Sequence, residues 1–123
     1  LVVPVRRKLR VRTVFNIMGP LINPAGAARG VIGVYDKKYS RVMAETLKLL
    51  GAKHIIVVNT EGVDEFTTTG KANVVELKNG QISEWEFDAQ DIGIPRCNVE
   101  DLKGGDAKVN SAILTSILKG EKP

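Results

Sequence analysis

The sequence is poor in the side chains that form disulfides, metal clusters and stacking surfaces. Cys97 is the only cysteine and His54 the only histidine among 123 residues, so no intrachain disulfide can form. The same scarcity excludes a zinc cluster of several cysteines and histidines. Aromatic residues make up 5% of the chain, and none lies among the cations near its start, which argues against a surface that stacks nucleic-acid bases. A single cysteine is typical of a reducing compartment, and we expect the cytoplasm.

Long apolar runs and export signals are also missing. No stretch approaches the roughly 18 apolar residues of a membrane-spanning helix, and no signal-peptide pattern is present. The chain begins with leucine and ends directly after a helix-like segment, so we expect it to be part of a longer polypeptide. Its length and its 43% apolar content predict at most one domain with a core of its own.

Charge is distributed unevenly along the chain. The net charge is +4, but residues 1–50 hold ten Lys/Arg and two acids, whereas residues 51–123 hold eight Lys/Arg and twelve acids. Five cations cluster near the start: Arg6, Arg7, Lys8, Arg10 and Arg12. A guanidinium offers a planar pair of donors that suits a carboxylate or a phosphate. On composition alone, a solvated cationic face is the better interpretation.

Two pairs of helix-breaking residues follow this basic cluster. An apolar run that carries Asn16 leads to Gly19-Pro20 and then to Asn23-Pro24. Proline restricts φ and glycine permits close backbone approach, so these residues predict a stiff loop that could contact a ligand. From the sequence alone, a tight turn without a ligand is the simpler interpretation.

The middle of the chain predicts a strand, a helix and a second strand. Residues 29–35 and 54–58 are nearly continuous apolar runs, typical of strands buried on both faces. Between them, Asp36 predicts an N-cap and Gly51 a C-terminal stop. One face of the intervening helix is apolar: Tyr39, Val42, Met43, Leu47 and Leu50. The pattern predicts a βαβ unit with parallel strands, and therefore an α/β fold.

A hairpin and a final helix are predicted downstream. Asn79-Gly80 joins segments 72–78 and 81–87 and predicts an antiparallel hairpin. Its apolar side is expected to comprise Val75, Leu77, Ile82, Trp85 and Phe87. Its glutamates are expected to face solvent: Glu76, Glu84 and Glu86. Asp106, after two glycines, predicts the N-cap of the final helix rather than a phosphate-binding turn, because its carboxylate already occupies the anion position.

Two adjacent acids, Asp64 and Glu65, follow the second predicted strand. The carboxyl ends of parallel strands are where open α/β sheets bind ligands, and carboxylate oxygens suit Mg²⁺. On spacing alone, a solvated acidic pair is the better interpretation.

Longer motifs point to a known family. The runs at residues 5–9 (Val-Arg-Arg-Lys-Leu) and 12–25 (Arg-Thr-Val-Phe-Asn-Ile-Met-Gly-Pro-Leu-Ile-Asn-Pro-Ala) resemble anthranilate phosphoribosyltransferases of tryptophan biosynthesis. Three shorter motifs occur in the family's order: Val34-Tyr35-Asp36, Val63-Asp64-Glu65 and Gly104-Gly105-Asp106. The resemblance covers nearly the whole chain. It implies that residues 1–123 are a partial α/β catalytic domain of the nucleoside phosphorylase/phosphoribosyltransferase type, without the N-terminal helical domain and the loop that cradles the diphosphate.

The resemblance also implies a reaction and a set of ligand contacts. The reaction transfers phosphoribosyl from phosphoribosyl pyrophosphate to anthranilate and releases pyrophosphate. Arg6 would grip the anthranilate carboxylate, and Gly19 and Pro20 would line the acceptor channel. Asp64 and Glu65 would hold the Mg²⁺ that accompanies phosphoribosyl pyrophosphate. No side chain of the chain is expected to act as a catalytic acid, base or nucleophile.

Further expectations and two alternatives accompany this assignment. Arg10 stands where the family usually has glycine, a residue that tolerates positive φ better than arginine does. The resemblance implies a homodimer formed through the N-terminal domain, and we expect the 123 residues alone to be inactive. The alternatives are a basic nucleic-acid-binding module of the same fold and a fragment of a pyrimidine nucleoside phosphorylase.

Overall fold

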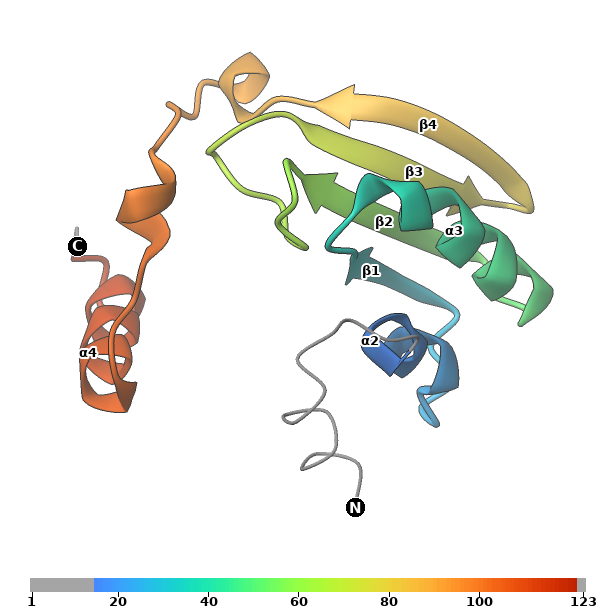
Figure 1. The fold of residues 1–123 in the computed structure, drawn as a ribbon, viewed down its shortest axis with the longest axis horizontal. Coiled ribbons are helices and arrows are strands. Elements are labelled where there is room, and N and C mark those ends of the chain that lie inside the picture. Colours follow the sequence, from blue (N-terminus) through green and yellow to red (C-terminus); the bar gives the residue numbers. More distant parts are fainter. Residues whose placement is uncertain (1–14, 122–123) are drawn as a thin grey trace.

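A computed structural model describes residues 15–121, in which a four-stranded sheet carries helices on one face (Figure 1). Strand order in the sheet follows the chain: β1 (Arg29–Gly33), β2 (His54–Thr60), β3 (Ala72–Lys78) and β4 (Gln81–Phe87). Strands β1 and β2 are parallel, whereas β2–β3 and β3–β4 are antiparallel. The predicted α/β class, with a parallel pair and an antiparallel hairpin, is confirmed.

The helix between the parallel strands begins and ends where the local signals predict. The Asp36 side chain accepts a hydrogen bond from the Lys38 backbone N–H at 3.1 Å, which caps a short 3₁₀ turn, η2 (Lys37–Tyr39). Helix α3 (Ser40–Leu49) follows directly, and Gly51 ends the segment with a φ of +89°. Glycine adopts this left-handed conformation without the steric cost that a Cβ would add.

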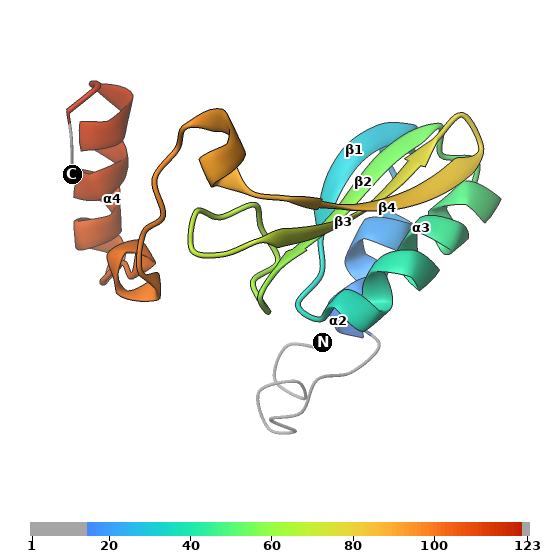
Figure 2. The same cartoon turned by 90° about the horizontal axis from the view of Figure 1, so that it is seen from above.

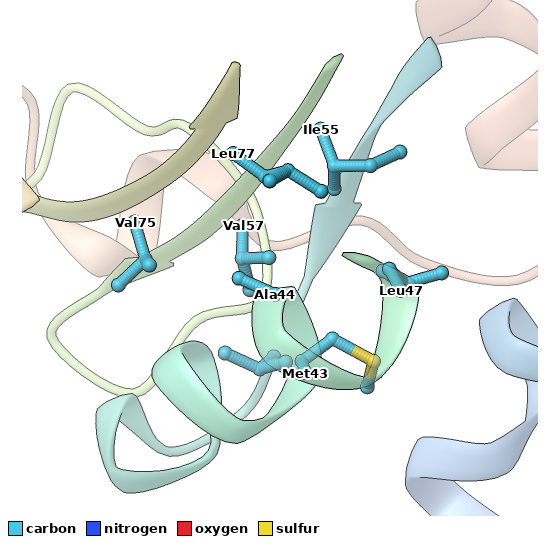
Figure 3. Close-up of a cluster of buried hydrophobic side chains, with 8 residues drawn as sticks. Met43, Ala44, Leu47, Ile55, Val57, Val75 and Leu77 are labelled. Carbon is cyan, nitrogen blue, oxygen red and sulfur yellow. The ribbon is translucent and has the colours of Figure 1, made fainter. Parts of the chain in front are cut away.

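The main core lies between the sheet and α3, and α2 (Phe15–Met18) lies on the same side of the sheet (Figure 2). Eight buried side chains form it, from the residue after β1, from α3 and from the two central strands: Val34, Met43, Ala44, Leu47, Ile55, Val57, Val75 and Leu77 (Figure 3). Ile17 of α2 packs against this cluster. Burial of this apolar surface stabilises the sheet against α3.

The prediction that the first strand is buried on both faces is wrong. The strand is shorter than expected, and Arg29, Gly30 and Val31 are exposed, Val31 by 61%. Within residues 15–121, β1 is an edge strand that pairs only with β2, and α3 covers only one face of the sheet. The apolar residues of β1 therefore reflect a preference for the extended strand conformation and do not indicate burial on both faces.

The hairpin forms in the predicted register, but its faces differ from the prediction. Asn79 and Gly80 have φ of +51° and +79°, as a two-residue type I′ turn requires. Trp85 pairs with Val74, so it lies on the face opposite Val75. The assignment of Trp85 and Phe87 to the apolar side of Val75 and Leu77 was wrong, because side chains alternate between the two faces of a strand.

One hairpin glutamate is also placed differently from the prediction. Glu76 does not point freely into solvent: its carboxylate is half-buried and lies 2.7 Å from Nε2 of His54 on the neighbouring strand. Val74 and Val75 are both buried, so β3 is covered on both faces. The half-buried Glu76 carboxylate on this largely buried strand finds a hydrogen-bonding partner in His54.

The C-terminal part extends away from the sheet in both views (Figures 1 and 2). It contains two 3₁₀ turns, η3 (Ala89–Ile92) and η4 (Val99–Leu102), and then helix α4 (Ala107–Leu118). The Asp106 carboxylate accepts hydrogen bonds from the Lys108 and Val109 backbone N–H groups, which confirms the predicted cap. Within residues 15–121 the helices are too short or too polar to cross a bilayer.

Candidate functional site

Gly19 and Pro20 line a cavity beside the edge strand. They belong to η1 (Gly19–Ile22), a 3₁₀ turn, so the predicted stiff loop is in fact helical at its start. Proline is compatible with a first helical turn, because its fixed φ is helical and the missing N–H would be unpaired there. Both residues are exposed, and they face a cavity of about 710 Å³.

The cavity walls come from η1, from β1 and from the end of α3. Its lining includes Gly30, Val31 and Ile32 of the strand and Leu47 of the helix, and it is mostly apolar. Arg29 supplies the only charged side chain among the lining residues of the described part of the chain. The apolar part of these walls can contact a flat apolar ring.

The predicted acidic pair lies in the loop after β2. Asp64 and Glu65 are exposed. Within residues 15–121, neither carboxylate forms an ion pair or accepts a hydrogen bond, so both keep their lone pairs for another ligand. The same residues contain no group of three or more acids, histidines and cysteines that could hold a metal ion. The loop can therefore offer a cation at most two carboxylates of its own.

The acidic loop begins with a two-residue turn. The Thr60 backbone N–H donates to the Val63 carbonyl and the Val63 N–H donates to the Thr60 carbonyl, each at 2.9 Å. Between them, Glu61 and Gly62 have φ of +49° and +92°. These angles are those of a type I′ turn, in which a glutamate at the first position is uncommon.

The cavity and the acidic loop meet at Gly33. This residue lines the cavity at the carboxyl end of β1, and the Asp64 backbone lies against its Cα. A methyl group in place of the Gly33 hydrogen would overlap the Asp64 carbonyl oxygen. Glycine is required here by close backbone approach. The structure thus places the loop that carries Asp64 and Glu65 next to the wall that Gly19 and Pro20 also line.

A second charged cluster lies at the carboxyl end of β1. The Lys38 ammonium is 3.0 Å from the Asp36 carboxylate and also lies 5.0 Å from the centre of the Tyr39 ring. The hydrogen bond to Asp36 raises the pKa of the Lys38 amine above its usual value. Lys38 therefore keeps its charge at neutral pH, but that charge is already paired within this cluster.

Sequence reasoning missed the residues that hold the acidic loop. Asn59 and Thr60 are both buried, and each uses its side chain to bond to the loop or to its surroundings. The sequence feature that could have indicated this role is the pair of polar residues at the end of the apolar run 54–58. Arg6 and the rest of the basic cluster lie outside the described residues, so the predicted grip on a carboxylate stays a prediction.

Comparisons with known proteins agree on one family. The family described as "Glycosyl transferase family, a/b domain" matches residues 1–123. Anthranilate phosphoribosyltransferase of Methanosarcina barkeri is 50% identical over 118 residues, which are 96% of this chain and 32% of that protein. The crystal structure of anthranilate phosphoribosyltransferase from Thermus thermophilus matches with a TM-score of 0.83 and 42% identity, over 98% of this chain and 35% of that one. The chain spans about a third of the length of these relatives.

A more distant structure shares the fold. Anthranilate phosphoribosyltransferase from Saccharomyces cerevisiae, solved in complex with PRPP and Mg, matches with a TM-score of 0.68 at 19% identity. The match covers 98% of this chain and 42% of the yeast chain. At this identity the likeness shows the fold alone.

Proposed function

Because the chain belongs to the a/b domain of the glycosyl transferase family, we propose that residues 1–123 form part of the catalytic domain of an anthranilate phosphoribosyltransferase. Such an enzyme transfers phosphoribosyl from phosphoribosyl pyrophosphate to the amine of anthranilate and releases pyrophosphate. The observation that carries the proposal is the 50% identity to the Methanosarcina barkeri enzyme over nearly the whole chain. An acidic loop at the carboxyl end of the parallel strands supports it independently.

On the leaving-group side, Asp64 and Glu65 would hold Mg²⁺. When bound, the cation neutralises the negative charge that develops on the departing pyrophosphate. Mg²⁺ is usually held by one or two carboxylates, with waters and substrate phosphates completing its octahedron. Two exposed carboxylates fit that requirement, and residues 15–121 place no cluster of three or more acids, histidines and cysteines there.

On the acceptor side, the cavity would take the aromatic ring. Gly19 and Pro20 would contact the ring through the backbone and the pyrrolidine face, and the guanidinium of Arg6 would bind the anthranilate carboxylate. These residues orient the amine toward the ribose carbon and do not exchange protons or bonds with it. Holding two reactants in the correct geometry lowers the barrier without a covalent nucleophile.

The cation assignment is tested by removing each carboxylate charge. Asp64→Asn and Glu65→Gln would be introduced into an enzyme of full family length that carries these 123 residues. We expect each to raise the Mg²⁺ concentration at half-maximal rate roughly tenfold or more, while the midpoint of thermal unfolding stays the same, because both side chains are exposed. Glu86→Gln, an exposed glutamate of β4, is the control. An unchanged Mg²⁺ dependence in both variants would show that the pair does not hold the cation.

The acceptor assignment is tested at Arg6 in the same enzyme. Arg6→Ala removes a charge-assisted hydrogen bond of about 1.5–3 kcal/mol, so kcat/KM for anthranilate should fall roughly ten- to a hundredfold. The KM for phosphoribosyl pyrophosphate should change little. Arg6→Lys should restore only part of the loss, because an ammonium lacks the planar pair of donors. Equal losses in Arg6→Ala and Arg7→Ala that disappear at high salt would instead support a general basic surface.

A further inference from the structure

The side chain of Asn59 connects two loops at the carboxyl edge of the sheet. Asn59 is 4% exposed, and both ends of its amide are hydrogen-bonded. Nδ2 donates to the Val34 carbonyl at 2.7 Å, and Oδ1 accepts from the Gly62 backbone N–H at 3.2 Å. One buried amide therefore fastens the turn of the acidic loop to the chain that leaves β1.

Thr60 holds the same loop from its other end. It is fully buried, and its hydroxyl donates to the Glu65 carbonyl at 2.7 Å. Its backbone N–H and carbonyl are both paired with Val63. Thr60 thus bonds to the residue before Asp64 and also to the residue after it, so the backbone at both acidic positions is constrained.

Two close contacts complete this arrangement. The Glu61 carboxylate packs over Gly70, where a Cβ would overlap it, and the Asp64 backbone packs on Gly33 in the same manner. Glu61 is one of two non-glycine residues with positive φ in the described part of the chain. A residue keeps such a conformation only where its surroundings enforce it, and such residues concentrate at ligand sites.

From these contacts we infer that Asn59 and Thr60 are positioning residues, which hold the backbone of the acidic loop in a cation-ready conformation. The inference rests on the proposed function, because it presumes that Asp64 and Glu65 bind a divalent cation. A small cation with strict octahedral geometry favours ligands that are already ordered, since an unordered loop loses conformational entropy on binding. Partners that orient metal ligands typically change affinity about ten- to a hundredfold when they are removed.

The decisive experiment compares variants of Thr60 in the 123-residue chain. Thr60→Val keeps the shape of the side chain and removes only the hydroxyl, whereas Thr60→Ser keeps the hydroxyl. Mn²⁺ is the probe, and its affinity is read from the paramagnetic broadening of amide NMR signals from residues 61–66. Hydrogen exchange of the same amides reports the order of the loop without metal. We expect Thr60→Val to weaken Mn²⁺ binding about tenfold and to accelerate exchange, and Thr60→Ser to restore both.

A matched control separates positioning from general stability. Thr46 in α3 also donates a 2.7 Å hydrogen bond to a backbone carbonyl, that of Val42, outside the loop. Thr46→Val should therefore leave the Mn²⁺ affinity and loop exchange unchanged. If Thr60→Val does not fold, Thr60→Ala removes the same hydroxyl and replaces it in the comparison.

The possible outcomes distinguish the two proposals. If Asp64→Asn abolishes Mn²⁺ binding but Thr60→Val binds as tightly as the unaltered chain, the positioning role is overturned and the cation site remains. If Asp64→Asn binds Mn²⁺ as the unaltered chain does, the cation assignment fails, and the positioning role fails with it. If Asp64→Asn and Thr60→Val both bind Mn²⁺ weakly, and Thr60→Ser recovers the affinity, the cation site and the positioning role are both supported.

Discussion

Helices α3 and α4 follow the same local rules but differ in what surrounds them. Each follows an aspartate whose carboxylate accepts a backbone N–H: Asp36 for the turn before α3, and Asp106 for α4. Each segment ends near a glycine with positive φ, Gly51 or Gly120. Yet α3 contributes four buried residues, three of them to the main core, whereas α4 contributes none.

The difference shows that local signals define a helix without determining whether it is packed. Helix α4 is the more apolar of the two, and five of its apolar side chains are exposed: Val109, Ile113, Leu114, Ile117 and Leu118. Helix α3 lies on the sheet and α4 stands apart from it (Figure 1). An isolated helix of about 12 residues is marginal in water, so packing accounts for most of the stability of α3.

The largest contrast is expected from core truncation. Leu47→Ala in α3 removes a side chain that is 6% exposed and should lower the free energy of unfolding by about 2–5 kcal/mol. Ile113→Ala in α4 should change it by less than about 0.5 kcal/mol, since that side chain is already exposed. Urea unfolding of the 123-residue chain measures both. Equal losses would mean that α4 belongs to the cooperative core.

A smaller contrast is expected from the two capping aspartates. Asp36→Ala should lower the free energy of global unfolding by about 1 kcal/mol, because the turn that it caps leads into the packed helix. Asp106→Ala should leave global unfolding unchanged and accelerate amide hydrogen exchange within α4 alone. A loss of global stability in Asp106→Ala would show instead that α4 unfolds together with the sheet. Asn and Ser, which also cap helices, should restore most of each loss.

The smallest effect is expected at Arg41, on the exposed side of α3. Its guanidinium donates to Glu84 of β4 at 2.8 Å and to Glu45 at 3.0 Å, and these bonds raise the pKa of Arg41 above its already high value. A raised arginine pKa contributes stability below that pKa, so the contribution is constant between about pH 7 and 10. Arg41→Gln should therefore lower stability slightly at low salt, with no pH dependence in that range. Addition of about 1 M NaCl should remove the difference, because salt screens exposed ion pairs.

Local features were predictable because their causes lie within a few residues. The Asp36 and Asp106 caps, the Gly51 stop and the Asn79-Gly80 turn each depend on neighbouring backbone groups, and all appear where the sequence indicates. The acidic loop was likewise predicted at the carboxyl end of β2, since that position follows from the order of elements. The contact of Arg6 with the anthranilate carboxylate stays a prediction, because Arg6 lies outside the described residues.

Features that depend on distant partners were not predictable. The sequence shows an apolar run at β1, but exposure of Val31 depends on which strands and helices surround it. The register of the hairpin places Trp85 and Val75 on opposite faces of the sheet. Glu76 is half-buried because His54 lies beside it on β2.

By itself, therefore, the sequence determined the order of the four strands and of helices α3 and α4, their boundaries to within a few residues, and the family motifs. Only the tertiary structure decided that Gly33 approaches the Asp64 backbone and that Asn59 reaches back 25 residues to the Val34 carbonyl. The physical reason is the distance along the chain between the residues that interact. Caps and turns are satisfied by hydrogen bonds between residues close in sequence, whereas burial and loop anchoring require segments far apart in the chain to meet in one register.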